Sequence, residues 1–219
     1  MHLPAIRAIA LRSAAIVVLS TAPLCSAELV VRDLTVSLEL LPTGFSYTLD
    51  NAAGTRSGDD AFSSGYGVAL GGRYSLSGPG DSTGFILGGE ITAGSYAYQG
   101  GGSMSTYGAR LLGGYGWAFG DRWSINALID AGAGAANLEL TGKAAFDHYA
   151  ASGLYYSYAA RVGLAFAATE SLLLAAEAGY RGISSSLAAG GTTITLSGTG
   201  LCAGVGIWYR FSNSPSTLE

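Results

Sequence analysis

Leu201-Cys-Ala-Gly-Val-Gly-Ile-Trp-Tyr-Arg-Phe211 is the stretch of sequence that decides the fold. Counting back in twos from Phe211 gives only apolar residues, while the residues between them are small, polar or able to make a polar contact. Such alternation over about ten residues is typical of a β-strand whose two faces lie in different environments. A strand of about 9–11 residues with one apolar face also fits the thickness of a membrane. The stretch therefore predicts a transmembrane β-strand.

The same stretch resembles the closing strand of Gram-negative outer-membrane β-barrels, which ends in an outward-facing aromatic residue. Tyr209 and Phe211 hold that place here. The resemblance is to the OmpA/OmpX-like superfamily of eight-stranded barrels, and it covers nearly all of the chain after residue 27. It implies outer-membrane localisation, outer-membrane lipids and lipopolysaccharide as surroundings, and the barrel assembly machinery as a partner. A monomer with an unknown surface partner is the corresponding expectation.

The N-terminus has the pattern of a secretory signal peptide. Arg7 and Arg12 give a basic region, residues 14–22 are mostly apolar, and Cys25-Ser-Ala27 offers small residues for cleavage. The apolar run is too short for a spanning helix, which needs about 20 residues. We therefore expect a signal peptide at 1–27, one barrel domain at 28–211 and a short tail at 212–219.

Composition limits the possible partners. Acidic residues outnumber basic ones, 15 to 11, and the net charge is −4, which argues against nucleic acid because nucleic acid requires basic patches. Gly is frequent, at 34 of 219 residues. No later apolar run is long enough for a membrane helix, so a membrane protein of this sequence must be a closed barrel. We find no pattern for a metal or a cofactor.

Turn signals divide the chain into eight expected strands, which predicts an all-β, closed antiparallel eight-stranded up-and-down transmembrane β-barrel. Short turns alternate with longer connections at 49–63, 99–104, 142–152 and 187–192, as in barrels with short periplasmic turns and longer outer loops. The expected strands are 34–48, 64–77, 83–98, 105–119, 122–141, 153–168, 171–186 and 193–211.

Aromatic residues gather near both ends of these strands, as in the two interfacial belts of membrane proteins. One belt is expected at the periplasmic ends: Trp117, Phe119, Trp123, Phe166, Tyr209 and Phe211. The other is expected near the outer ends: Tyr47, Tyr66, Tyr98, Tyr107, Tyr156 and Tyr158.

The face opposite the apolar one carries nearly every charge within the strands. Acids on odd strands alternate with arginines on even strands, so each acid should have an arginine on both neighbouring strands. Charges in a lumen of low polarity must be paired, and the planar arginine fork can bridge two carboxylates. We therefore expect a lumen ion-pair network, to which Arg181 adds a second base on the seventh strand; the alternative is scattered solvated charges. The network residues are Glu39, Arg73, Glu90, Arg110, Asp130, Arg161, Glu177 and Arg210.

Three functional classes remain open. The first is a structural or surface-interaction barrel with a charge-filled lumen, and the alternative is a small passive pore. The third is a lipid A-modifying barrel enzyme, for which His148, beside Asp147 in an outer loop, is the candidate base. Adjacent residues need not converge on one site, so we expect no enzyme, no catalytic residues, no cofactor and no metal.

Overall fold

The computed structural model describes residues 30–75, 83–98, 100–141 and 149–211. The predicted signal peptide at 1–27 and tail at 212–219 lie outside this range. No helix in the described part is long and apolar enough to cross a membrane. The described residues form nine β-strands: β1 Val30–Leu40, β2 Gly44–Asn51, β3 Gly54–Ser75, β4 Gly84–Tyr98, β5 Gly102–Phe119, β6 Trp123–Leu140, β7 Tyr149–Ala167, β8 Leu172–Ala189 and β9 Thr192–Arg210.

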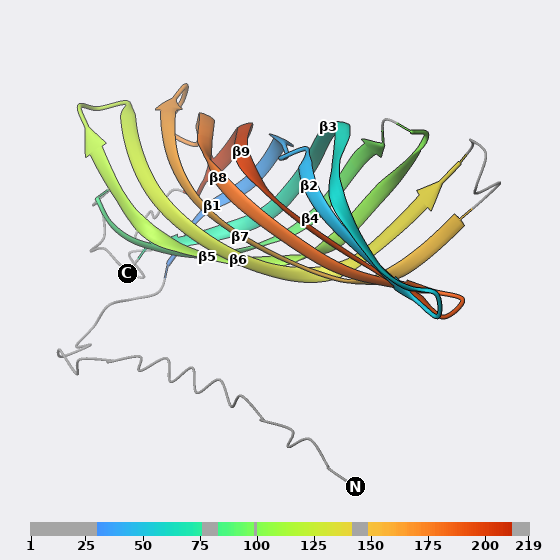
Figure 1. Cartoon of the computed structure of the whole chain (residues 1–219). Helices are drawn as coiled ribbons and strands as arrows, with labels where there is room; N and C mark the ends of the chain where they lie inside the picture. The colour runs from blue at the N-terminus through green and yellow to red at the C-terminus, as the bar shows by residue number, and fades with distance from the viewer. Residues whose placement is uncertain (1–29, 76–82, 99, 142–148, 212–219) are drawn as a thin grey trace, which may run out of the picture.

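All strand pairs are antiparallel, and the pairings close into a ring (Figure 1). Strands β1 and β2 lie end to end and share one strand position in the ring, because each pairs with β3 on one side and with β9 on the other. From β3 to β9 every strand pairs with the next one in the chain. The ring therefore has eight strand positions, and the predicted fold class is confirmed.

The first predicted strand, 34–48, is interrupted at residues 41–43. Pro42 has no N–H group to donate, and the ladder is carried past it by two hydrogen bonds. The Leu41 N–H donates to the Gly65 carbonyl and the Phe62 N–H donates to the Thr43 carbonyl, each at 2.9 Å. The register of β3 shifts between Phe62 and Ser64, which marks a β-bulge opposite the interruption.

The strands are strongly tilted. A path that starts at Glu39 and moves from each residue to its ladder partner on the next strand returns to the first strand position at Leu49, ten residues further along the chain. The path passes through Gly67, Gly94, Thr106, Ala136, Gly153, Leu187 and Ile194. A stagger of this size over eight strands tilts them by roughly 40° from the barrel axis. We call the end where β1 begins and β9 ends the terminal end, and the opposite end the distal end.

Two of the longer outer loops expected from the sequence, at 49–63 and 187–192, were wrongly predicted, because strands extend through most of them. Residues 142–148 of the expected loop at 142–152 lie outside the described residues. The expected loop at 49–63 is a hairpin, in which β2 and β3 pair from Gly44 and Ala61 to Asn51 and Gly54. Strands β8 and β9 likewise pair as far as Ala189 and Thr192. Within the hairpin, alternate residues are polar and bond across the strands on the exposed face, as Ser46 does with Asp59 at 3.0 Å. The strand ladder therefore satisfies backbone groups that a loop would leave to water.

The barrel exterior is a continuous apolar surface, as on a membrane-spanning barrel. Aromatic residues ring its terminal end, including Trp117, Phe119, Trp123, Tyr209 and Phe211, all exposed. Tyr66, Tyr107, Tyr156 and Tyr158 are exposed nearer the distal end. Tyr47 and Tyr98 were wrongly expected in this second belt, because both point inward and pack against buried residues. Between the belts lie exposed aliphatic side chains, among them Leu38, Leu70, Ile91, Leu111, Ile129, Val162, Leu174, Leu201 and Val205.

The lumen is filled in three layers. Apolar side chains around Trp208 and Leu173, and around Leu112 and Leu128, lie toward the terminal end. Charged residues fill the middle, as described below. A larger apolar cluster fills the distal part. On each strand that contributes a charged residue to the middle of the lumen, the cluster members lie nearer the distal end than that residue. This distal cluster comprises Leu41, Phe45, Phe62, Tyr96, Met104, Ala136, Leu138, Ala151, Tyr155, Ile183, Leu187, Ile194 and Leu196.

Candidate functional site: the charged layer of the lumen

The middle layer holds four arginines and four carboxylates from seven of the nine strands. Their side chains are at most 10% exposed. Equal numbers of opposite charges make the layer electrically neutral, which is the condition for keeping ions in a poorly hydrated interior. We call this set the charged layer: Glu39, Arg73, Glu90, Arg110, Asp130, Arg161, Glu177 and Arg181.

Arg110 joins two carboxylates that come from different sides of the lumen. Its Nε donates to Glu90 on the neighbouring strand β4 at 2.6 Å. Its two Nη atoms donate to the two oxygens of Glu39 on β1, and the Nη1 bond is 3.0 Å long. This is the bidentate geometry that only a planar guanidinium provides. Arg110 therefore ties β5 to β4 along the wall and to β1 across the lumen.

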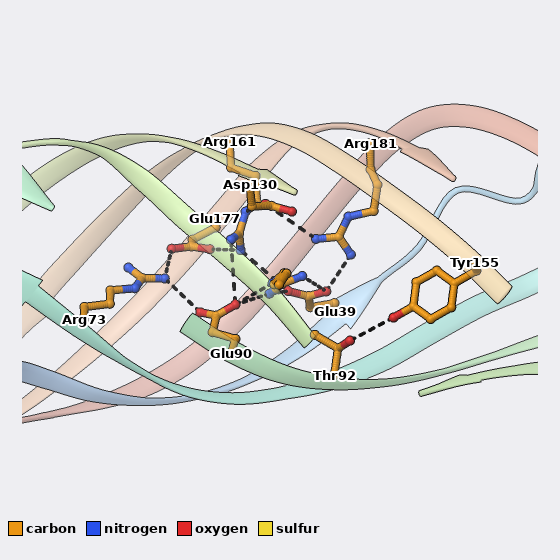
Figure 2. A network of polar contacts seen from close by, with 10 residues as sticks. Glu39, Arg73, Glu90, Thr92, Asp130, Tyr155, Arg161, Glu177 and Arg181 are labelled. Carbon is orange, nitrogen blue, oxygen red and sulfur yellow. Dashed lines mark hydrogen bonds and ion pairs between the residues drawn. The ribbon is translucent and has the colours of Figure 1, made fainter. Parts of the chain in front are cut away.

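Glu177 plays the complementary part among the carboxylates. Figure 2 shows it between Arg73 and Arg161, with one oxygen accepting from Arg73 at 2.8 Å and the other from Arg161 at 2.7 Å. Arg161 also contacts Asp130 on β6, with Nε and Oδ2 2.8 Å apart. These contacts continue the layer from β3 through β8 to β6.

Two further contacts fix the layer at its ends. Arg181 of β8 donates to Glu39 at 2.8 Å, so Glu39 is shared by two arginines. The guanidinium carbon of Arg73 lies 4.1 Å from the centre of the Trp208 ring. This cation–π contact joins the charged layer to the apolar layer at the terminal end.

Glycine leaves room for these long side chains. A Cβ atom on Gly71 would lie 2.5 Å from Cγ of Glu90, and one on Gly132 would lie 2.8 Å from Cβ of Arg110. Real Cβ contacts are essentially never this short. The frequent glycines on the inner face therefore provide the space that the charged side chains occupy.

The structure brings together seven of the eight residues expected in the lumen network. The eighth, Arg210, was wrongly included, because it lies at the terminal end and pairs with Asp33 at 3.2 Å. Arg181 stands in its place beside Glu39. The expected pattern, in which each acid is held by both neighbouring strands, fits Glu90, which contacts Arg73 and Arg110. It does not fit Glu39, because its three hydrogen bonds come from Arg110 and Arg181, on strands that are not neighbours of β1.

Little space remains around the charged layer. One cavity of about 10 Å³ is bounded by Glu39, Arg161, Glu177 and Arg181, and another of about 20 Å³ lies beside Arg110 and Tyr155. Each has room for about one water molecule. Several buried polar atoms, including Nε and Nη1 of Arg73 and Oδ1 of Asp130, have no hydrogen-bond partner among the described residues. The layer is a closed block of paired charges.

The other candidate sites have less support from the described residues. His148, the candidate base of the alternative that was not favoured, and Asp147 beside it lie outside the described residues. No group of three or more His, Cys, Asp or Glu residues in the described part could hold a metal ion. Cys202 is a free thiol buried on the inner face. The eight residues of the charged layer are held in ion pairs with one another, an arrangement that restricts their movement.

No family model and no curated protein matches the chain. The barrel is similar to solved structures at low sequence identity. Ail of Yersinia pestis is 14% identical with a TM-score of 0.40 over 83% of this chain and 100% of Ail. Neisserial surface protein A is 12% identical with a TM-score of 0.41 over 81% and 97%. OprG of Pseudomonas aeruginosa is 14% identical with a TM-score of 0.44 over 83% and 96%. The strand pairings, independently of these similarities, establish the closed barrel.

Proposed function

We propose that this chain is an outer-membrane β-barrel with a structural or surface-interaction role, whose lumen is closed to ions and small solutes. The apolar exterior with its aromatic rings supports the membrane location. A closed ring leaves no unpaired strand edge in the lipid, which is the condition for a sheet to span a membrane.

The cross-lumen pairing of the charged layer is the observation that carries the closed-lumen proposal. Arg110 and Arg181 reach Glu39, and Arg73 reaches Glu177, so the paired groups come from strands that are not neighbours. An eight-stranded barrel is just wide enough to be filled by side chains. An ion entering the lumen would have to break several of these pairs, which attract one another more strongly in a confined lumen than in water.

The distal end is the end that we assign to the outside of the cell. The beginning of β1 and the end of β9 lie at the opposite end, next to one another in the pairing of Asp33 with Arg210. The β2–β3 and β8–β9 hairpins would then present polar strands at the surface, with exposed groups such as Ser46, Thr48 and Asp59. This surface is where an interaction role would reside.

Solute entry into vesicles tests the proposal. Barrels refolded into phospholipid vesicles should swell in isotonic glycine or arabinose no faster than protein-free vesicles. A variant in which Glu39, Glu90 and Arg110 are all changed to Ala, so that both carboxylates are removed together with the arginine that holds them, should swell faster, which shows that the assay detects an open lumen. Swelling of the wild-type vesicles at the rate of the triple variant would favour a small passive pore.

A further inference from the structure

The distal mouth of the barrel contains a hollow whose lining differs from the charged layer. Two overlapping cavities, of about 290 and 350 Å³, share Leu49, Arg56, Leu140 and Ile194 in their walls. Together they form what we call the distal cavity. Each is at least ten times larger than the cavities beside the charged layer, and sites for small molecules commonly have roughly this volume or more.

The floor of the distal cavity is apolar. It is made by Phe62, Leu138 and Leu196, which belong to the distal cluster and are buried. Tyr47 and Tyr98 stand at its side, and Tyr149 lines the upper part. Rigid aromatic and aliphatic walls around a hollow favour a ligand with an apolar body.

Arg56 is the one charged residue among the described residues that line the cavity. It is the ladder partner of Leu49, so both side chains project from the same face of the hairpin. Two carboxylates of the hairpin are engaged elsewhere, because Asp50 accepts a hydrogen bond from Thr55 and Asp59 accepts one from Ser46. An apolar hollow with one cation at its rim is complementary to an apolar chain with one anionic head.

We propose that the distal cavity binds a free medium-chain fatty acid, with the alkyl chain on the floor of Phe62, Leu138 and Leu196 and the carboxylate at Arg56. The guanidinium can receive both carboxylate oxygens. The proposal goes beyond the role proposed above and does not depend on it, because the cavity lies on the distal side of the charged layer. A barrel that conducts and a barrel that does not could both hold this ligand.

Methyl NMR of the full barrel in nanodiscs of deuterated phospholipid tests the proposal. Decanoate, decanol and decyltrimethylammonium, which share a chain and differ in the head, are added in turn. Decanoate should shift the methyl signals of Ile194, Leu138 and Leu196 in a saturable way. Val205, which is exposed on the exterior, reports partition into the lipid and should respond alike to all three.

The charge of the head is tested by Arg56→Gln, with Arg122→Gln at the terminal end as the matched control. Wild type and the control should bind decanoate more tightly than decanol by about fivefold, the size expected for one partly exposed ion pair. Arg56→Gln should remove that preference and leave decanol binding unchanged. Leu140→Gln should weaken both ligands, and migration of unboiled samples should show that each variant is folded.

Two results would overturn the proposal. In the first, none of the three compounds shifts the cavity methyl signals in a saturable way. In the second, decanol and decanoate bind equally to the wild type, or Arg56→Gln leaves their ratio unchanged. Neither result depends on whether the barrel conducts ions. The fatty-acid proposal can therefore fail while the closed-lumen proposal holds, and the reverse is also possible.

Discussion

Arg110 on β5 holds Glu39 on β1 by two hydrogen bonds across the lumen, although β5 and β1 are not neighbours in the ring. The two residues are 71 positions apart in the chain. A barrel wall is otherwise held only by ladders between neighbouring strands. The pair therefore braces the barrel across its width and fills the lumen at the same time.

Replacing Arg110 with Met should strongly destabilise the barrel. The change leaves Glu39 without its bidentate partner and Glu90 without its shortest hydrogen bond to an arginine. Removing one partner of a buried ion pair typically costs roughly 3–5 kcal/mol. Urea-induced unfolding from phospholipid vesicles measures the free energy of unfolding, and a variant as stable as the wild type would mean that Arg110 is solvated.

Rescue of this variant should depend on which acids are neutralised. Adding Glu39→Gln and Glu90→Gln to Arg110→Met should recover much of the lost stability, because these are the carboxylates that Arg110 contacts. Adding Glu90→Gln and Asp130→Asn should recover less, since Asp130 is held chiefly by Arg161. Equal recovery in the two triple variants would contradict the cross-lumen pairing.

Arg181 and Arg210 should differ sharply when each is changed to Met. The side chain of Arg181 is 5% exposed and bonds to Glu39, while that of Arg210 is 27% exposed and pairs with Asp33. Arg181→Met should cost roughly 3–5 kcal/mol, and Arg210→Met should cost less, because the guanidinium of Arg210 is partly solvated and screened. The same urea titration compares them, and a larger loss at Arg210 would return it to the network that the sequence predicted.

Two adjacent glycines give a matched test of the packing around the charged layer. A Cβ on Gly71 would lie 2.5 Å from Cγ of Glu90, whereas one on Gly72 would meet nothing closer than 3.9 Å. Gly71→Ala should therefore destabilise by about 1–3 kcal/mol through overpacking, and Gly72→Ala should have little effect. Equal stability of the two variants would show that Glu90 and the Gly89 carbonyl oxygen, which would lie still closer to the added Cβ, can both move aside.

Electrophoretic mobility should depend on heating. A closed ring offers no free edge from which strands can unravel one at a time, so the folded barrel should resist dodecyl sulfate until it is boiled. Unboiled and boiled samples should run at different positions on a gel. Identical migration, together with recovery of the protein in the soluble fraction of cells, would contradict the membrane barrel.

The strand count and the membrane-facing surface could be predicted from the sequence because they follow from local alternation. Leu201 to Phe211 shows its two faces in the residue types alone. The β2–β3 hairpin was missed although Phe45, Tyr47 and Leu49 alternate with Ser46, Thr48 and Asp50 in the same way. Its Gly and Asp residues were taken as signs of a loop, whereas cross-strand bonds on its exposed face hold it as a ladder.

The partners within the lumen could be predicted only in part. The alternation of residues along each strand places Arg110 and Glu39 on the inner face. It does not give their positions along the barrel axis, which depend on the stagger of the strands around the ring. For this reason Arg210 was grouped with residues far from it, and Arg181 was given a minor place. The apolar distal cluster around Met104 and Leu187 also escaped the sequence analysis, which expected small or polar residues throughout the inner face.

Single-channel recording in planar lipid bilayers tests the closed lumen most directly. Wild-type barrels should give no stable conductance, because the charged layer crosses the lumen and the apolar layers cover it on both sides. Any rare opening should become more frequent when Arg110 or Arg161 is neutralised, and Arg122→Gln at the terminal end serves as the control. Steady, voltage-insensitive channels from the wild-type protein would contradict the account and identify the barrel as a pore.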